Sequence, residues 1–267
     1  MECYWQRCFD LMSSLRVTII IPAYRENETI TPTLMRIAES ILIPFECVVV
    51  IDEPDDKTID YVKKFSELNP HFRFVANDLG KGPAFAIKKG FEIAEAPIAV
   101  VTMADGSDDP RLIDELVRLV ERGVVIAAAS RYMPGGQQIG APKLKSGLSK
   151  LAGKTLYWFA GVGTHDATNS FKAYSVSFVR SVDIHSKQGF EIGLELVAKA
   201  NRLGEKIAQL PTIWIERDSG NSNFKLIKWL PNYFAWYLFA FGRRRTLNEL
   251  SLSSKKLIAV LSKLNRK

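Results

Sequence analysis

Short apolar runs that alternate with helical patterns constrain this fold more than any other feature of the sequence. Residues 17–21 (VTIII), 48–51 (VVVI) and 98–101 (IAVV) are rich in β-branched side chains, which is typical of buried strands. Residues 28–40 and 58–68 carry apolar side chains at helical spacing. We therefore predict a parallel, doubly wound sheet with right-handed crossovers. Further strands are expected at 72–75 and 124–129, and further helices at 84–94 and 112–121.

A cluster of acids follows the expected strand at 98–101, in the sequence TMADGSDDP. In open α/β sheets, ligands bind at the carboxyl edge of the strands. Carboxylates gathered there are suited to Mg²⁺ or Mn²⁺ carried with phosphates. Asp109 directly precedes Pro110 and has the position of a helix N-cap. Asp105 precedes Gly106 and lies outside the helix, so we predict that it binds metal.

Polar residues also follow the other expected strands. Pro22, Asp52 and Asp105 come after three different strands, so they should share one edge of the sheet. An acidic crevice there is suited to a nucleotide and its metal. A turn or cap role is an equally good interpretation of Asp55 and Asp56. The residues expected to form this crevice are Tyr24, Glu26, Asp52, Asp55, Asp56 and Asp105.

A glycine-rich turn at residues 80–85 (GKGPAF) precedes the expected helix at 84–94. It offers main-chain N–H groups and Lys81 at a helix start, and both attract phosphate. The turn has neither the spacing of a Walker loop nor that of a dinucleotide fingerprint. We predict that Lys81 and Gly82 contact a phosphate of the donor.

Composition narrows the classes of partner and the cellular compartment that are compatible with this chain. The net charge of +7 is compatible with an anionic substrate, an acidic membrane surface or nucleic acid; we predict no nucleic-acid partner. Three cysteines, Cys3, Cys8 and Cys47, lack metal-site spacing and indicate a reducing cytoplasm. No run reaches the roughly 18 apolar residues of a membrane span. Residues 1–14 differ in pattern from the rest of the chain and are expected to form a peripheral extension, with Met12 as an alternative start.

The second half of the chain has weaker patterns. Residues 132–154 are rich in Gly, Pro, Lys and Ser and hold four cations from Lys143 to Lys154, which indicates a mobile loop that closes over an anion or a solvated connection. In the helix expected within 184–200, Glu191 and Glu195 lie one turn apart on one face. Such a pair is in isolation more typical of a solvent-facing surface than of a site. One or two short strands are expected at 206–215.

The tail at residues 226–241 (LIKWLPNYFAWYLFAF) is dense in aromatic side chains and is followed by Arg243, Arg244 and Arg245. We predict a helix lying in the membrane interface, because aromatic rings and cations favour that position. The alternative is a helix packed on the domain or on a dimer partner. Residues 247–267 are expected to form a basic amphipathic helix. The predicted division is an extension at 1–14, one α/β domain at 15–222 and a helical tail at 223–267.

Taken together, these motifs resemble family 2 glycosyltransferases, and most closely the branch that transfers mannose to dolichyl or polyprenyl phosphate. The resemblance covers residues 17–240 and rests on VTIIIPAYRENETI, VVVIDEPDDKT, GKGPAF, MADGSDDP, SRY, DATNSFKAY and GFEIGLEL in that order. It implies a GT-A fold, a mostly parallel and Rossmann-like sheet flanked by helices. It also implies a nucleotide-diphospho-sugar donor, Mg²⁺ or Mn²⁺, and a lipid phosphate acceptor.

The resemblance also implies roles for particular residues. On the donor side, Pro22, Tyr24 and Glu26 match the element that holds base and ribose, Asp52 the acid that contacts the base, and Ala104 and Asp105 the end of the D-x-D motif at the metal and diphosphate. On the acceptor side, the matched residues are Arg131, Asp166, Thr168 and Lys172, the helix acid Glu195, and Arg217, Gly220 and Ser222 of the R-x-x-G-x-S loop.

Three departures from the family pattern affect these roles. Met103 stands where the first acid of D-x-D is expected, and a thioether does not replace a carboxylate on Mg²⁺. Asp105 would then hold the metal with phosphates and water, or with help from Asp108. Asn223 stands where many relatives have Lys, so Lys225 is expected to take that place. The second strand ends in DEP rather than DDGS, which affects contacts with the donor base.

These residues predict sugar transfer to polyprenyl phosphate with inversion at the anomeric carbon. An acceptor phosphate is mostly dianionic at neutral pH and needs no strong base. We expect Arg131, Lys172, Arg217 and Lys225 to bind phosphates. The alternatives are a non-lipid acceptor, a nucleotidyltransferase, which the absence of a G-x-G-T-R-like loop disfavours, and a nucleotide-sugar-binding module with little catalysis. The sequence leaves open the sugar, the choice of GDP or UDP, and a homodimer. The expected location is cytoplasmic, on the inner face of the membrane.

Overall fold

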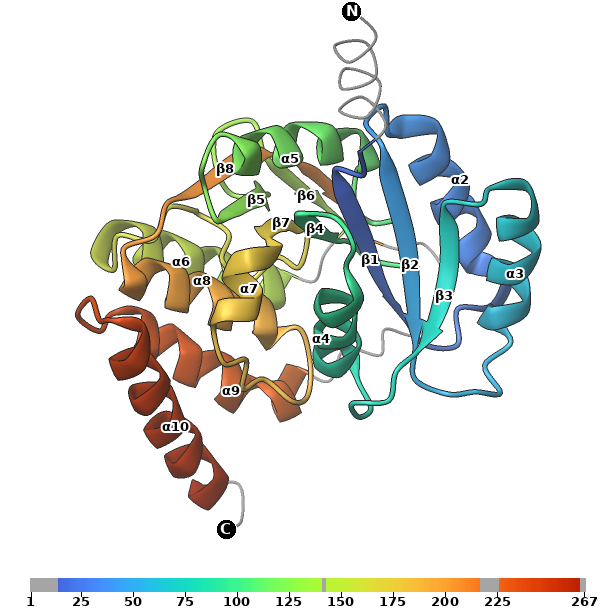
Figure 1. Ribbon diagram of the computed structural model, residues 1–267. Coiled ribbons are helices and arrows are strands. Elements are labelled where there is room, and N and C mark those ends of the chain that lie inside the picture. The colour runs from blue at the N-terminus through green and yellow to red at the C-terminus, as the bar shows by residue number, and fades with distance from the viewer. Residues whose placement is uncertain (1–13, 141–142, 217–225, 265–267) are drawn as a thin grey trace, which may run out of the picture.

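The computed structural model describes residues 14–140, 143–216 and 226–264 (Figure 1). A seven-stranded sheet runs through the molecule in the order β3-β2-β1-β4-β7-β5-β8, and β6 and β9 form a separate parallel pair. The strands are β1 Val17–Ala23, β2 Phe45–Ile51, β3 Phe72–Ala76, β4 Ile98–Val101, β5 Ile126–Ser130, β6 Gln137–Ile139, β7 Lys172–Ser175, β8 Ile207–Pro211 and β9 Ile213–Ile215.

Helices cover both faces of the sheet (Figure 1). The α-helices are α2 Thr31–Ser40, α3 Thr58–Leu68, α4 Pro83–Ile93, α5 Ile113–Glu121, α6 Lys143–Phe159, α7 Val176–Ser181, α8 Glu191–Leu203, α9 Leu226–Ala240 and α10 Leu247–Leu264. Short 3-10 turns, Asn27–Ile30 and Pro110–Leu112, precede α2 and α5. As predicted, Asp109 caps the second turn by accepting from the Arg111 N–H.

The β-branched runs form buried strands because each of their faces is covered. Along β1, Ile20 packs into the core on the α4 and α8 side. Its neighbours Ile19 and Ile21 point to the opposite core, with Leu34 of α2 and Leu116 of α5. A strand buried on both faces reads as a continuous apolar run, which is the pattern that identified β1, β2 and β4.

One strand breaks the parallel pattern. β7 lies antiparallel between β4 and β5, so that Lys172 pairs with Val101 and Ala128. Every other neighbouring pair in the sheet is parallel. The prediction of a mostly parallel sheet is thus confirmed, while a strictly parallel one is wrong.

The segment predicted as a loop over 132–154 is largely structured, because it contains β6 and the first two thirds of α6. Gly153 explains how this glycine-containing helix packs. A Cβ atom there would overlap the His165 carbonyl oxygen, so only glycine lets α6 approach the chain so closely. The helix owes its stability to this packing rather than to local propensity.

The aromatic tail forms α9, which packs lengthwise on α8 (Figure 1). Trp229 and Trp236 are buried, while Leu230, Phe234 and Leu238 are exposed. One side of α9 therefore packs on the domain, as the alternative prediction for residues 226–241 has it. The other side of α9 is exposed to solvent. The amphipathic helix predicted at 247–267 is α10. None of the described helices is long and apolar enough to cross a bilayer.

Candidate active site at the carboxyl edge of the sheet

The sheet topology brings the predicted residues to one edge. β1, β2 and β4 are parallel neighbours, so Asp52 after β2 and Asp105 after β4 lie on either side of the end of β1. β4 and β5 both run antiparallel to β7 and are therefore parallel to each other. Arg131, directly after β5, consequently lies at the same edge. This is the edge at which open α/β sheets bind ligands.

Asp52 is joined to the glycine-rich turn. Its Oδ2 accepts the main-chain N–H of Gly82 at 2.6 Å, and its Oδ1 accepts from Asn77 Nδ2 at 2.7 Å. Gly82 has φ +107°, a conformation that favours glycine, and is the N-cap residue of helix α4. Asn77 was not predicted from the sequence, although it directly follows β3. Asp52 was predicted because it directly follows a strand, and the same reasoning applies to Asn77.

The loop after β1 has a strained backbone. Arg25 and Asn27 have φ of +56° and +53°, unusual for residues other than glycine. Asp56 stabilises the loop, because its carboxylate accepts the main-chain N–H groups of Arg25 and Thr58 at 2.7 and 2.9 Å. Its role is thus the turn contact that the sequence left as an alternative. Strain of this kind gathers at functional sites.

The remaining donor-side residues surround this loop. Pro22 lies in β1 and pairs with Val50 of β2. Tyr24 is 38% exposed, and the Arg25 guanidinium lies 5.1 Å from the centre of its ring. Lys81 is exposed and pairs with Glu53 at 3.2 Å. It is therefore open to solvent, and a ligand phosphate would compete with Glu53 for its ammonium group.

The acidic turn after β4 presents its carboxylates in two different ways. Asp105 is partly exposed, and its Oδ1 accepts the Ser107 N–H at 3.0 Å. Asp108 is 5% exposed, and its Oδ2 accepts from Thr102 Oγ1 and from the Met103 N–H, each at 3.0 Å. Burial, together with the nearby Asp105 charge, raises the pKa of Asp108 to about 7. Ala104, which precedes Asp105, is also buried, and its carbonyl accepts from the Thr33 hydroxyl.

These two carboxylates fit a metal that is shared with a ligand. Asp108 Oδ1 is buried and has no hydrogen-bond partner among the described residues. An orphaned carboxylate oxygen costs free energy unless a cation or water reaches it. The described part of the chain contains no group of three or more Asp, Glu, His or Cys side chains that could hold a metal by themselves. Mg²⁺ and Mn²⁺ sites of one or two carboxylates completed by substrate phosphates and water match this donor set.

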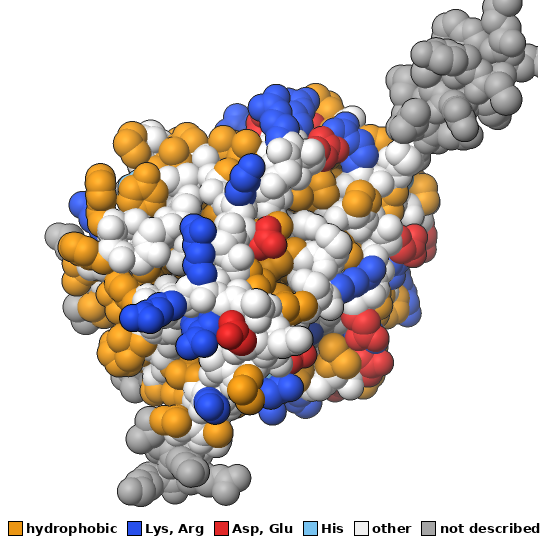
Figure 2. Space-filling view, turned by 60° about the vertical axis from the view of Figure 1, so that its left-hand side comes forward, with side chains coloured by type: hydrophobic (Ala, Val, Ile, Leu, Met, Phe, Trp, Pro, Cys, Tyr) orange, Lys and Arg blue, Asp and Glu red, His pale blue; other side chains and the backbone are white. Residues whose placement is uncertain are grey.

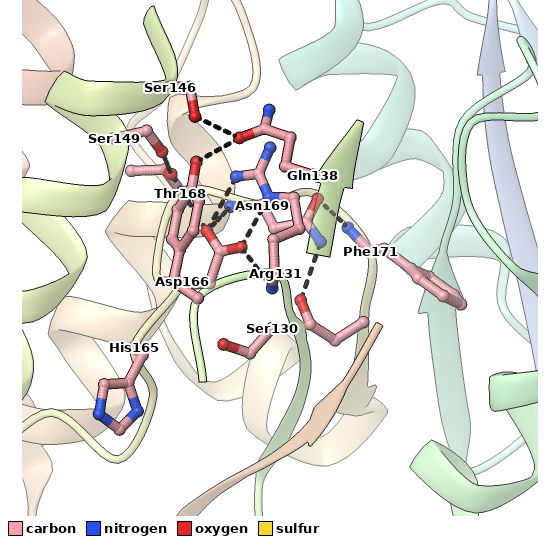
Figure 3. Close-up of polar contacts among 12 residues, drawn as sticks. Ser130, Arg131, Gln138, Ser146, Ser149, His165, Asp166, Thr168, Asn169 and Phe171 are labelled. Atoms are coloured by element: carbon pink, nitrogen blue, oxygen red, sulfur yellow. Dashed lines mark hydrogen bonds and ion pairs between the residues drawn. The ribbon is translucent and has the colours of Figure 1, made fainter. Parts of the chain in front are cut away.

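Arg131 is held by a buried ion pair (Figure 3). Its Nε and a terminal nitrogen donate to the two oxygens of Asp166 at 2.7 and 2.9 Å, and its main-chain N–H donates to the same carboxylate. Burial lowers the pKa of Arg131, but the Asp166 charge and hydrogen bonds outweigh it and raise that pKa overall. Thr168 extends the network to Ser149 of α6 at 2.6 Å. Arg131 therefore remains cationic in a fixed orientation.

Two residues predicted near the acceptor phosphate are enclosed by protein. Lys172 is fully buried, and its ammonium donates to the carbonyls of Ala167 and Asn169. Burial lowers the pKa of Lys172 to about 7. Asp166 is also fully buried and binds Arg131. The predicted contacts of Lys172 and Asp166 with a phosphate stay predictions, since in this structure Lys172 contacts main-chain carbonyls and Asp166 contacts Arg131.

Glu195 of α8 is enclosed by protein groups. It is fully buried, pairs with Lys199 at 2.5 Å and accepts the main-chain N–H groups of His185 and Ser186, each at 2.7 Å. One turn earlier, Glu191 accepts the N–H groups of Gln188 and Gly189. The solvent-facing interpretation of the pair is wrong, because both side chains are buried, while the catalytic role of Glu195 stays a prediction.

These two glutamates together hold the segment 185–189, which we call the cradle segment. It lies against the glycine-rich turn, since a Cβ atom on Gly82 would be 2.7 Å from the Gln188 carbonyl oxygen. Four other predicted residues, Arg217, Gly220, Ser222 and Lys225, lie outside the described residues.

Comparisons with known proteins identify the family and the fold of this chain. The glycosyl transferase family 2 profile matches residues 18–182. A polyprenol monophosphomannose synthase from Mycolicibacterium smegmatis is 26% identical, over 80% of this chain and 86% of its own length. An undecaprenyl-phosphate mannosyltransferase from Micrococcus luteus is 27% identical, over 78% of this chain and 87% of its own.

Solved structures show the same fold. Glucosyl-3-phosphoglycerate synthase from Mycobacterium tuberculosis, solved with Mn²⁺ and UDP, has a TM-score of 0.62 at 16% identity over 87% of this chain and 82% of its own. A mannosyltransferase from Pyrobaculum calidifontis, solved with GDP-Man and Mn²⁺, has a TM-score of 0.59 at 18% identity over 95% of this chain and 75% of its own. The family match covers more than half of the sequence, and this chain belongs to glycosyl transferase family 2.

Proposed function

We propose that this glycosyltransferase moves a hexose from a nucleotide-diphospho-sugar to a polyprenyl phosphate, with inversion at the anomeric carbon. The observation that supports this most directly is the arrangement at the carboxyl edge. A partly exposed Asp105 and the orphaned oxygen of Asp108 follow β4, and the fixed cation of Arg131 follows β5, on the other side of β7. The named functions of the two relatives supply the acceptor class.

The reaction joins two anions, so the charges of the site do most of the work. An acceptor phosphate oxygen attacks the anomeric carbon, the bond from that carbon to the diphosphate breaks, and the nucleoside diphosphate leaves with the electron pair. A bound Mg²⁺ or Mn²⁺ would be held by Asp105 and Asp108 and would neutralise charge on the leaving diphosphate. Arg131 lowers the repulsion on the approaching phosphate, and it needs no reorganisation because Asp166 already orients it.

The test is transfer of radiolabelled sugar from a panel of GDP- and UDP-sugars into organic-extractable lipid, with polyprenyl phosphate in vesicles and with Mg²⁺ or Mn²⁺. We expect transfer from one donor, removed by chelation and lowered about a hundredfold or more by Asp105→Ala. The matched control is Asp60→Ala, an exposed acid in the first turn of α3, which should behave as wild type. Full activity of the folded Asp105→Ala protein would remove the metal role.

Met103 favours a second candidate, a nucleotide-sugar-binding module with little catalysis, because one expected carboxylate is missing from the metal motif. Calorimetry separates the two proposals. Donor binding without turnover on any acceptor, lipid or water-soluble, would support the module.

Location at the cytoplasmic face of a membrane follows from the proposed acceptor and from the cysteine pattern, and fractionation of the producing cells would test it.

A further inference from the structure

Two rows of exposed apolar side chains run along α6 and α9. They are large side chains, from 41% to 78% exposed, in helices whose other sides are packed. Contiguous exposed apolar surface of this kind marks an interaction site in a folded protein. The residues are Leu148, Leu151, Trp158 and Phe159 from α6 and its C-terminal end, and Leu230, Phe234, Leu238 and Phe241 from α9 and its C-terminal end.

The two rows belong to one surface. The hydroxyls of Thr155 and Tyr237 lie 2.9 Å apart and join the two helices. Each helix is anchored by its inner side, since Leu156 is fully buried and Trp236 is 1% exposed. The outward rows are thus held in place by the fold. We name the exposed residues of both rows the apolar face.

Cations accompany this face. Lys150 and Lys154 are exposed on α6, and the exposed Arg243, Arg244 and Arg245 follow α9. Neither helix contains an Asp or Glu. On the side of the molecule seen in Figure 2, hydrophobic side chains gather along the left, with Lys and Arg next to them. An apolar surface with basic residues at its margin is complementary to the interface of an anionic bilayer.

The apolar face also reaches the candidate active site. Ser149 of α6 contacts Thr168, whose hydroxyl also donates to the Asp166 carboxylate that binds Arg131. On the same helix, Leu148 and Leu151 point outward. Helix α6 therefore connects the cation of the site to the exposed apolar surface within about two helical turns.

We propose that the apolar face of α6 and α9 lies in the interfacial layer of an anionic bilayer, and that α6 guides the isoprenoid chain of the acceptor from that bilayer toward Arg131. The bilayer contact follows from the surface alone. The guidance of the isoprenoid chain rests on the proposed function.

The test uses the full chain with phosphatidylcholine vesicles, with and without phosphatidylglycerol, in a co-sedimentation assay. We expect binding that increases with phosphatidylglycerol and weakens with salt. The double variant Leu151→Asp and Phe234→Asp should bind vesicles at least about tenfold more weakly than wild type, because each change puts a charge into the interface. The matched control is Leu42→Asp with Leu68→Asp. It changes two other exposed leucines, one just after α2 and one at the end of α3, and should bind vesicles as wild type does.

Activity separates the two parts of the proposal. We expect the double variant to keep donor affinity and transfer to a short, water-soluble isoprenyl phosphate, and to lose transfer to polyprenyl phosphate in vesicles. Vesicle binding without any transfer would leave the bilayer contact standing while the proposed function fails. If the double variant binds vesicles as well as wild type does, the bilayer contact is overturned. It is also overturned if wild type does not bind vesicles and instead forms a concentration-dependent dimer that is absent in the double variant.

Discussion

At the scale of single residues, the site depends on which charged side chains are enclosed and which are open. Arg131 and Asp166 form a bidentate pair in which the carboxylate is fully buried and the cation is 11% exposed, whereas the cation of the pair between Arg111 and Asp109 is 79% exposed. A buried pair is costly to break because the remaining charge loses both water and partner. An exposed pair contributes little, because water and salt screen it.

We predict that Asp166→Asn lowers the free energy of unfolding by about 3–5 kcal/mol, since it leaves the Arg131 guanidinium buried without its counter-charge. Asp109→Asn should change it by about 1 kcal/mol or less, because asparagine also caps a helix and the pair is exposed. Urea unfolding followed by circular dichroism measures both values. Equal effects of the two variants would contradict the assignment of Arg131 to a buried pair.

At the scale of elements, two turns far apart in the sequence support each other. The glycine-rich turn donates to Asp52, and the cradle segment lies against it. The cradle segment in turn is held by two carboxylates on one face of α8. A change in either turn should therefore be felt at the donor side of the site.

We expect Gly82→Ala to lower the free energy of unfolding by at least about 2 kcal/mol and to weaken binding of the nucleotide-sugar. The added Cβ meets the Gln188 carbonyl, and alanine disfavours φ +107°. Gly147→Ala is the control, because nothing lies within 4 Å of its Cβ position and it is inside α6. That variant should gain about 0.5–1 kcal/mol. Denaturant titration and donor calorimetry compare the two, and an unaffected Gly82→Ala protein would refute the packing argument.

Glu195 predicts a pH dependence of stability. Burial raises its pKa, but hydrogen bonds from His185 and Ser186 and the charge of Lys199 outweigh burial and lower the pKa to about 2. The unfolded chain, with a glutamate pKa of about 4.3, then binds more protons than the folded one between these values. The stabilisation by Glu195 is complete above about pH 4.3 and is lost as the pH falls toward 2.

The measurement is the free energy of unfolding across that pH range. Glu195→Gln should be less stable than wild type at neutral pH and should show a shallower decline in acid. Glu67→Gln, an exposed glutamate in α3, should keep the wild-type slope. If Glu195→Gln and wild type decline in parallel, the carboxylate does not hold the cradle segment in the ionised form.

At the scale of the whole molecule, α9 has two different sides. Its inner side extends the core over α8, where Trp236 lies 5.3 Å from the ring of Phe239 and 5.1 Å from the Lys199 ammonium. Its outer side belongs to the apolar face. The same aromatic composition that indicated a membrane helix therefore serves both packing and exposure.

We predict that Trp236→Ala lowers the free energy of unfolding by about 3–5 kcal/mol, because it leaves a large cavity between α8 and α9. Trp158→Ala, at 72% exposure on α6, should change it by about 0.5 kcal/mol or less. Thermal unfolding by calorimetry gives both. If both substitutions lower the free energy of unfolding by similar large amounts, the apolar face is buried in solution. If neither substitution changes it, α9 is not packed on α8.

The sequence by itself determined every strand of the seven-stranded sheet except β7, most of the helices, and the edge that Pro22, Asp52 and Asp105 share. These features follow from local periodicity and from the rule that parallel strands end at one edge. Only the tertiary structure decided that Lys172, Asp166 and Glu195 are enclosed and that α6 is a helix with an exposed apolar row. Burial is set by contacts between distant segments, such as β7 inserting between β4 and β5 or α6 meeting His165, and no local pattern records those contacts.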